Sequence, residues 1–278
     1  LELMFLLVAT LFAFLIPVFQ EIALWTAAVL ILLFAIYMWL QSRGEIEEPT
    51  LLGPAAAIGS LSKGPRRAVI LVLCMYAATV IIISASPFAD GLIEVGKMLT
   101  IDEFILIQWV APLASEAPEM LVAILLVRRG KAVGALVLLI SAKVNQWTLL
   151  VGTLPLAFSI SLGEARSLPL DTRQTEEFLL TAAQSLFAVI LLIKMRIGII
   201  GALTLFLFFI TQLLSPLLTL IHPVFTDDVV LNIRMAYSLV YLGLGILLLV
   251  VDRDRILELY KSAIYVLNSF RKRPEPQR

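Results

Sequence analysis

The sequence predicts an all-α, polytopic transmembrane helical bundle with about eight spans. Three observations predict it. Hydrophobic residues make up 60% of the 278 residues, and charged residues only 15%, whereas soluble domains carry about 25% charged residues. Several apolar runs are long enough to cross a hydrocarbon core of about 30 Å, which needs roughly 17–25 helical residues. Polar and ionisable residues interrupt two of these runs, at membrane depth.

Eight apolar runs meet this length criterion. The fifth run is long for one straight span, so we expect it to tilt or break at its polar cluster. A shorter amphipathic stretch, 90–99, follows the third run and is expected at the membrane interface. The eight runs are residues 3–19, 22–40, 68–86, 104–127, 132–161, 178–193, 197–220 and 230–251.

The charges between the runs predict the orientation of the chain. Lys and Arg gather in the loops 41–67 and 128–131, in the turn 194–196 and in the tail after residue 251, whereas the alternate loops are acidic or mixed. An excess of Lys and Arg marks the cytoplasmic side. We therefore expect an integral membrane protein of the plasma (inner) membrane, with residue 1 and the C-terminus in the cytoplasm. The lipid bilayer is its first partner, and the zero net charge argues against a nucleic-acid partner.

A weak internal repeat occurs at an offset of 175 residues (177 − 2). Glu2 matches Glu177, and Leu11-Phe12-Ala13 matches Leu186-Phe187-Ala188. The predicted topology makes the two segments cross the membrane in opposite directions, as in transporters built from inverted repeats. No signal peptide precedes the first span. We therefore expect the chain to begin within a first repeat, with the missing N-terminal half of the same protein as its partner.

These observations predict five regions. We expect the last two helices of a truncated first repeat, a cytoplasmic loop, a second five-helix repeat with both polar interruptions, an extra transmembrane helix and a basic cytoplasmic tail. Gly243 and Gly245 permit close helix packing, including the contact of a possible homodimer. The regions are 1–40, 41–67, 68–220, 221–251 and 252–278.

The first polar interruption is Ala114-Ser115-Glu116-Ala117-Pro118-Glu119. Glu119 lies about 22 Å of helix beyond Phe104, at 1.5 Å per residue, and is therefore well inside the membrane. Pro118 removes a backbone hydrogen bond and predicts a helix break. Carboxylate, hydroxyl and carbonyl oxygens suit a hard cation such as Na⁺ or Ca²⁺, so Glu119 and Ser115 are the predicted metal ligands. A carboxyl group removed from water also favours its protonated form, so Glu119 is a candidate proton carrier.

The second interruption, Ser141 to Gln146, lies about one helix later and carries Lys143 and Asn145. Lys143 lies 12 residues into its apolar run (143 − 131), and we expect it to face inward and pair with a carboxylate. Ser141, Asn145 and Gln146 are candidate cation ligands. Polar side chains also join helices to one another in membranes, and for Ser141 this alternative stays open.

These two segments resemble the paired motifs of the sodium/calcium exchanger superfamily, the cation/Ca²⁺ antiporters. Ala114 to Glu119 is similar to the first motif; Ser141 to Gln146, followed by Leu149-Leu150-Val151-Gly152, is similar to the second. The resemblance covers about 68–220, and it implies the second of two inverted repeats. It implies that Glu119 coordinates the cation and accepts protons, that Ser115 is a hydroxyl ligand and that Gln146 is a closing amide ligand.

Two positions depart from the superfamily's pattern. Glu116 stands where the superfamily has a serine, and Lys143 stands where it has an asparagine that contributes a carbonyl oxygen. An ammonium at the site would repel a divalent cation by several kcal/mol at an effective dielectric constant of about 20. We therefore expect a secondary active antiporter, working by alternating access, that exchanges a monovalent cation (Na⁺ or K⁺) for protons. The alternatives are a Ca²⁺/cation exchanger, or a non-transporting scaffold or sensor whose site is locked by a Lys–Glu pair.

The sequence does not predict an enzyme or a cofactor. No His-Glu-x-x-His metal motif occurs, and the single histidine, His222, lies at a loop edge. Cys74 is the only cysteine and lies in an apolar run, so metal–thiolate chemistry is not expected. The expected ligand is the transported cation itself: Na⁺, K⁺, H⁺ or Ca²⁺.

Overall fold

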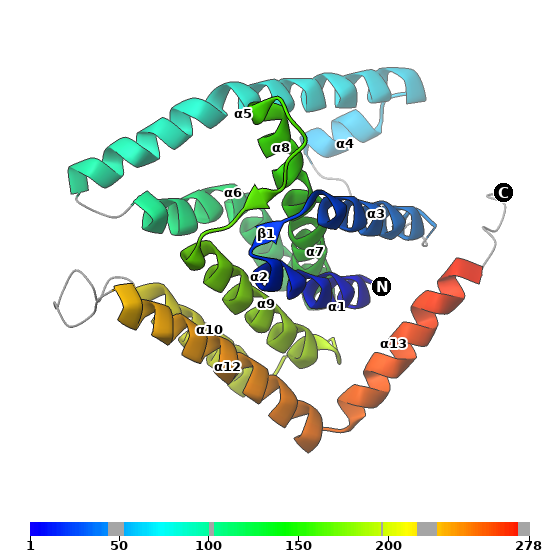
Figure 1. Ribbon diagram of the computed structural model, residues 1–278. Helices are drawn as coiled ribbons and strands as arrows, with labels where there is room; N and C mark the ends of the chain where they lie inside the picture. Colours follow the sequence, from blue (N-terminus) through cyan, green and yellow to red (C-terminus); the bar gives the residue numbers. More distant parts are fainter. Residues whose placement is uncertain (44–52, 100–102, 196, 216–226, 272–278) are drawn as a thin grey trace. The chain divides into compact units, whose positions relative to one another are not determined.

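The computed structural model describes residues 1–43, 53–99, 103–195, 197–215 and 227–271 (Figure 1). The chain divides into two compact units. Unit 1 comprises Leu1–Gly44 and Glu119–Arg278, and unit 2 comprises Glu45–Pro118.

Unit 1 is built from helices and one short strand pair. Its N-terminal elements are α1 (Glu2–Ala13), α2 (Leu15–Phe19), β1 (Glu21–Ile22) and α3 (Leu24–Gln41). The broken helix that follows α6 comprises α7 (Ala132–Asn145), the π-helical turn η1 (Gln146–Leu150) and α8 (Val151–Leu162). The remaining elements are β2 (Leu168–Pro169), α9 (Thr172–Leu192), α10 (Ile199–Leu214), α12 (Asp227–Val251) and α13 (Asp254–Arg271).

Unit 2 contains α4 (Pro54–Gly59), α5 (Lys63–Leu99) and the first part of α6 (Glu103–Arg128). We expected a span at 68–86 and a separate interfacial stretch from residue 90. The structure instead has one 37-residue helix, α5, that passes through Pro87 without a break. A proline removes a single helical hydrogen bond, and here the flanking residues keep the helical conformation.

Six helices of the described chain are long and apolar enough to cross a membrane, and Ile199–Gln212 forms a shorter apolar helix. The expected span at 104–127 is α6. The expected span at 197–220 is described as far as Ser215, and its last residues lie outside the described part of the chain. The predicted fold class, an all-α polytopic transmembrane bundle, is confirmed.

The backbone repeats at the offset that the sequence shows. In the described chain, Gln20 (φ 55°) and Met195 (φ 52°) are the non-glycine residues with positive φ, and they lie 175 positions apart (195 − 20). Each follows a helix that it helps to end. The next helices, α3 and α10, start at Leu24 and Ile199, again 175 positions apart (199 − 24).

The two repeated segments run in opposite directions. After α2, β1 pairs antiparallel with β2, which precedes α9, and Leu170 N donates to Gln20 O at 2.9 Å. The end of the α1–α2 segment therefore lies beside the start of α9. Further along, the hydroxyls of Thr10 on α1 and Ser185 on α9 are 2.8 Å apart. Figure 1 shows the two segments side by side with opposite chain directions.

The main core of unit 1 lies among α1, α3, α7, η1 and α9. It includes the fully buried Ala9, Leu30, Val144 and Val189. These residues come from four different helices, so the broken helix α7–η1 packs directly against α1, α3 and α9.

The helix α12 forms a second core with α9 and α10 around Tyr241, which is fully buried. The ring of Phe208 lies 5.7 Å from that of Tyr241. Arg234 of α12, only 4% exposed, places Nε 2.8 Å from Oε1 of Glu177 on α9. α12 falls in the region predicted as an extra transmembrane helix, and it packs along α9.

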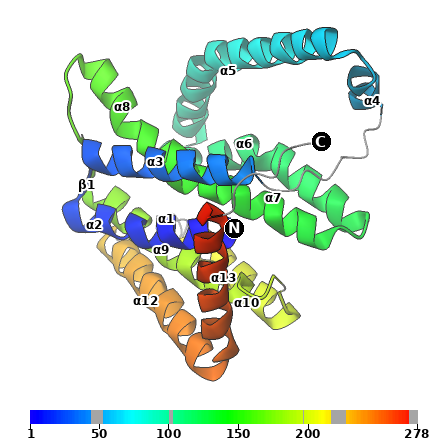
Figure 2. The same cartoon turned by 90° about the vertical axis from the view of Figure 1, so that its right-hand side faces the viewer.

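The last helix, α13, crosses the end of the bundle at which α1 begins (Figure 2). Leu259 and Val266 pack against the main core, and the ring of Phe270 lies 6.2 Å from that of Trp39. α13 therefore packs against the bundle along one of its faces.

Candidate functional site

The first polar motif lies inside α6, which passes through Pro112 and Pro118 without interruption. The predicted helix break at Pro118 is therefore not present. Pro118 lacks the N–H that would bond the carbonyl four residues earlier, yet the neighbouring residues keep the helical conformation. The proline thus frees a carbonyl oxygen at this level of the helix without ending it.

The side chains of this motif lie in two units. Ser115 is exposed, and its hydroxyl donates to the carbonyl of Pro112 at 3.2 Å. Glu116 and Glu119 are half-buried. Unit 2 ends at Pro118, so Glu119 belongs to unit 1 together with the second motif. Among the described residues, the Glu119 carboxylate forms neither a hydrogen bond nor an ion pair.

The second polar motif coincides with a change of helix type. α7 ends at Asn145, and the π-helical turn η1 begins at Gln146. The expected break at this polar cluster is present as η1. The Thr148 hydroxyl donates to the carbonyl of Val144, which satisfies one backbone group at the turn. Single π-helical turns inside α-helices occur frequently at functional sites.

The motif has a buried face and an open face. Val144, Trp147 and Thr148 are buried against the core, whereas Lys143 and Asn145 are exposed. Gln146 is half-buried, and its Oε1 accepts a hydrogen bond of 2.6 Å from the Lys143 ammonium. The structure thus brings the amide predicted to bind a cation together with the lysine from the same motif.

Ser141, the first residue of this motif, contacts a different helix. Its hydroxyl is 2.9 Å from the hydroxyl of Tyr37 on α3. Ser141 therefore joins two helices, which is the alternative that the sequence left open. Tyr37 could not be identified from the sequence, because its contact with Ser141 joins residues 104 positions apart. The one signal available was a phenol within a predicted span.

The same helix, α3, also contacts the chain beyond the break. A Cβ at Gly152 of α8 would lie 3.0 Å from Ile31 Cγ1 and 3.3 Å from the carbonyl oxygen of Ala27. A side chain at this position would crowd both groups, so glycine favours the close approach of α8 to α3. α3 thus contacts the broken helix both before and after η1.

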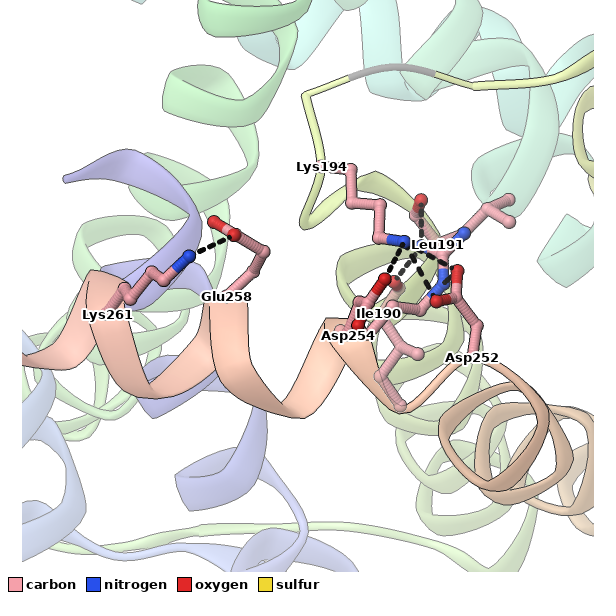
Figure 3. Close-up of polar contacts among 8 residues, drawn as sticks. Ile190, Leu191, Lys194, Asp252, Asp254, Glu258 and Lys261 are labelled. Carbon is pink, nitrogen blue, oxygen red and sulfur yellow. Dashed lines mark hydrogen bonds and ion pairs between the residues drawn. The ribbon is translucent and has the colours of Figure 1, made fainter.

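Outside the two motifs, a cluster of charged side chains lies where α9 ends and α13 begins (Figure 3). Lys194 Nζ lies 2.8 Å from Asp252 Oδ1, and Arg255 Nη1 donates to the carbonyls of Ile190 and Leu191 at 2.8 Å each. The hydrogen bond from Lys194, with the nearby charges of Lys194 and Arg255, lowers the pKa of the Asp252 carboxyl below its ordinary value. From the sequence, these basic residues predicted only the topology of the chain.

No group of three or more His, Cys, Asp or Glu side chains that could hold a metal ion lies within the described ranges.

Comparison with known proteins identifies the family. The model of the sodium/calcium exchanger protein family matches residues 69–218. A crystal structure titled as that of the H⁺/Ca²⁺ exchanger CAX superposes with a TM-score of 0.84 and 42% sequence identity, covering 96% of this chain and 64% of that chain. The chain thus spans less than two thirds of the length of that structure. No curated protein matches the chain. Because the family model matches more than half of the 278 residues, the chain belongs to the sodium/calcium exchanger family, a family of transporters rather than enzymes.

Proposed function

We propose that this chain is part of a secondary active antiporter that exchanges Ca²⁺ for H⁺ across a membrane. The observation that carries the proposal is its 42% identity with the H⁺/Ca²⁺ exchanger CAX over 96% of this chain. The half-buried carboxylate of Glu119, within an apolar helix, supplies the chemistry that the exchange requires. Small inorganic cations and the lipid bilayer are the corresponding partners.

The expectation of a monovalent cation receives less support than the Ca²⁺ alternative. That expectation assumed that the Lys143 ammonium repels a divalent ion at the site. The ammonium donates to Gln146 on an exposed face of the helix, and a flexible four-carbon stem lets it move away from an arriving cation. The charge of Lys143 therefore does not exclude Ca²⁺.

We assign the site residues by their chemistry. Glu119 binds the cation in its ionised form and a proton in its neutral form, so that one carboxylate couples the two fluxes. Ser115, Asn145 and Gln146 offer neutral oxygens of the kind that Ca²⁺ prefers. Glu116 and Lys143 set the charge around them. Ser141 joins α7 to α3 through its contact with the Tyr37 hydroxyl.

We further propose that residues 1–40 and 177–214 are equivalent hairpins of two inverted repeats, with 68–220 as the second repeat. The shared offset of the positive-φ residues Gln20 and Met195 supports this assignment, as does the opposite course of α1–α2 and α9. The positive-inside pattern supports a cytoplasmic C-terminus, which places the tail 252–278 there, in a protein of the plasma (inner) membrane. The rest of the first repeat is the expected partner, and a homodimer stays a prediction.

Ion flux into proteoliposomes that hold the intact protein tests the exchange. Under an imposed pH gradient, we expect Ca²⁺ uptake that discharges the gradient and is lost in Glu119→Gln. Glu164→Gln is the matched control, because Glu164 is 64% exposed and forms a surface ion pair with Arg166. It should transport like the parent.

The other outcomes separate the alternatives. Flux of Na⁺ or K⁺ in place of Ca²⁺ would restore the monovalent reading. Absence of flux for every ion, from protein shown to be folded, would refute transport and favour the scaffold or sensor. Lys143→Asn, which introduces the asparagine of the superfamily's motif, should keep or increase Ca²⁺ flux.

A further inference from the structure

The broken helix α7–η1–α8 is held by α3, which lies outside the segment that the family model matches. Before the break, the Tyr37 hydroxyl meets Ser141 at 2.9 Å. After the break, Gly152 packs against Ala27 and Ile31. The rest of the second polar motif, from Lys143 to Gln146, lies between these two contacts.

Tyr37 is itself fixed by packing. Its side chain is 4% exposed. Its ring centroid lies 5.3 Å from that of Phe5 on α1 and 6.5 Å from that of Phe34 one turn earlier on α3. Tilted aromatic contacts of this kind add to the burial of the ring. The phenol oxygen therefore has a defined position, and it holds Ser141 at a defined position on α7.

The contact with Ser141 fixes the rotation of α7 about its axis. Val144 and Thr148 face the core on the same side as this contact, and both are fully buried. Lys143 and Gln146, three residues apart, share the open face. A rotation of about 20° would move each Cα by about 0.8 Å, given a Cα radius of about 2.3 Å, and would displace the tips of the side chains further. The place of the Gln146 amide thus depends on the contact at Ser141.

We propose that Tyr37 is a positioning residue of the cation site: through Ser141, its hydroxyl sets the rotation of α7 ahead of the π-helical turn and thereby places Gln146. The proposal rests on the proposed exchange function. It assigns to the N-terminal segment a role in a motif that belongs to the other repeat.

The first test compares transport by Tyr37→Phe, Ser141→Ala and the double variant in proteoliposomes of the intact protein. Each variant should raise the half-saturating Ca²⁺ concentration roughly three- to tenfold, the size expected for one hydrogen bond, with the maximal rate within about twofold. The half-saturating concentration of the double variant should not exceed that of the more affected single variant, because the same hydrogen bond is lost in all three. Additive effects would overturn the proposal.

Tyr241→Phe is the matched control. Tyr241 is fully buried, and its hydroxyl also has one side-chain partner, Gln184 Nε2 at 3.4 Å, in the α9–α12 contact. This variant should lower the melting temperature about as much as Tyr37→Phe does, yet leave the half-saturating concentration unchanged. An equal rise in that concentration for both variants would mean general destabilisation and would overturn the proposal.

A readout independent of transport tests the role of Tyr37 separately from the proposed exchange function. In a cysteine-free background that includes Cys74→Ser, Val144→Cys should react slowly with a water-soluble thiol reagent, because Val144 is fully buried. Adding Tyr37→Phe should accelerate the reaction several-fold, and adding Tyr241→Phe should not. Unchanged reactivity would overturn the proposal. Accelerated reactivity in a protein without Ca²⁺ flux would support the control of α7 by Tyr37 and refute the exchange function alone.

Discussion

Thr10 and Ser185 bond to each other through their hydroxyls at 2.8 Å, and they lie 175 positions apart in the sequence. The same offset relates Gln20 to Met195. When two segments are related by a two-fold axis, equivalent residues meet each other only on that axis, as in a self-complementary interface. In the proposed inverted repeat, the Thr10–Ser185 bond therefore lies on the local axis between α1 and α9.

The first prediction concerns this bond. Thr10 is fully buried, and Thr10→Val keeps its shape while leaving the Ser185 hydroxyl without this partner. We expect the free energy of unfolding to fall by about 0.6–1 kcal/mol. The lower value is the average for hydrogen bonds in membranes, and the upper value is typical of soluble proteins. Ser185→Ala should cost a similar amount, and the double variant no more than the larger single loss. Denaturant unfolding in detergent measures all three, and additive losses would show that the hydroxyls do not interact.

The second prediction concerns the two left-handed residues. Gln20 and Met195 adopt φ of 55° and 52°, which costs a residue with a Cβ roughly 1–2 kcal/mol relative to glycine. Glycine loses part of this advantage through the entropy of the unfolded chain. We expect Gln20→Gly and Met195→Gly each to stabilise the protein by about 0.5–1 kcal/mol. Gly163→Ala should destabilise it, because Gly163 has φ of 76°. A loss of stability in both glycine variants would contradict this account of the helix ends.

The third prediction concerns the pH dependence of the cluster at the start of α13. The pKa of Asp252 is lowered, chiefly by the hydrogen bond from Lys194. A carboxyl whose pKa falls on folding contributes stability above its unfolded value, about 3.9, and loses that contribution as the pH falls through the lowered value. The melting temperature of the parent should therefore fall below about pH 4 by more than that of Asp252→Asn. Parallel pH profiles of the two proteins would show that Lys194 and Arg255 do not stabilise this junction.

The fourth prediction concerns the close approach of α8 to α3. Gly152→Ala would place a methyl group 3.0 Å from Ile31 Cγ1, and overpacking of this kind typically costs about 1–3 kcal/mol. Adding Ile31→Ala should recover part of the loss. Gly134→Ala on α7 is the control, because nothing lies within 4 Å of its Cβ position, and alanine favours a helix. Unfolding midpoints measure the series, and equal effects at the two glycines would argue against close packing at Gly152.

Much of the fold could be predicted because its signals are patterns that can be seen in the sequence itself. Apolar runs of membrane-spanning length correspond to the helices, and the offset of 175 residues, found from a few apolar matches, recurs in the backbone at Gln20 and Met195. The helix break predicted at Pro118 is absent, because Pro118 lies inside the continuous helix α6, and Pro87 likewise lies inside α5. A proline weakens a helix by a known amount, but the surrounding packing decides whether the helix ends there.

The candidate site could be predicted in its composition but not in its contacts. The hydrogen bond from Lys143 to Gln146 joins residues three positions apart, so helical spacing alone permits it. The bond between Tyr37 and Ser141 joins helices that meet only in the tertiary structure. The sequence also could not show that Glu119 and Ser115 fall in different compact units.

The π-helical turn of the broken helix would be expected to act as a hinge, since its backbone hydrogen bonding is weaker than that of an α-helix. The two contacts with α3 give it the opposite character. Tyr37 of α3 contacts α7, and Ile31 of α3 contacts Gly152 of α8. α3 therefore braces the broken helix on both sides of η1. We therefore expect α7, η1 and α8 to keep a fixed bend and to move together with α3.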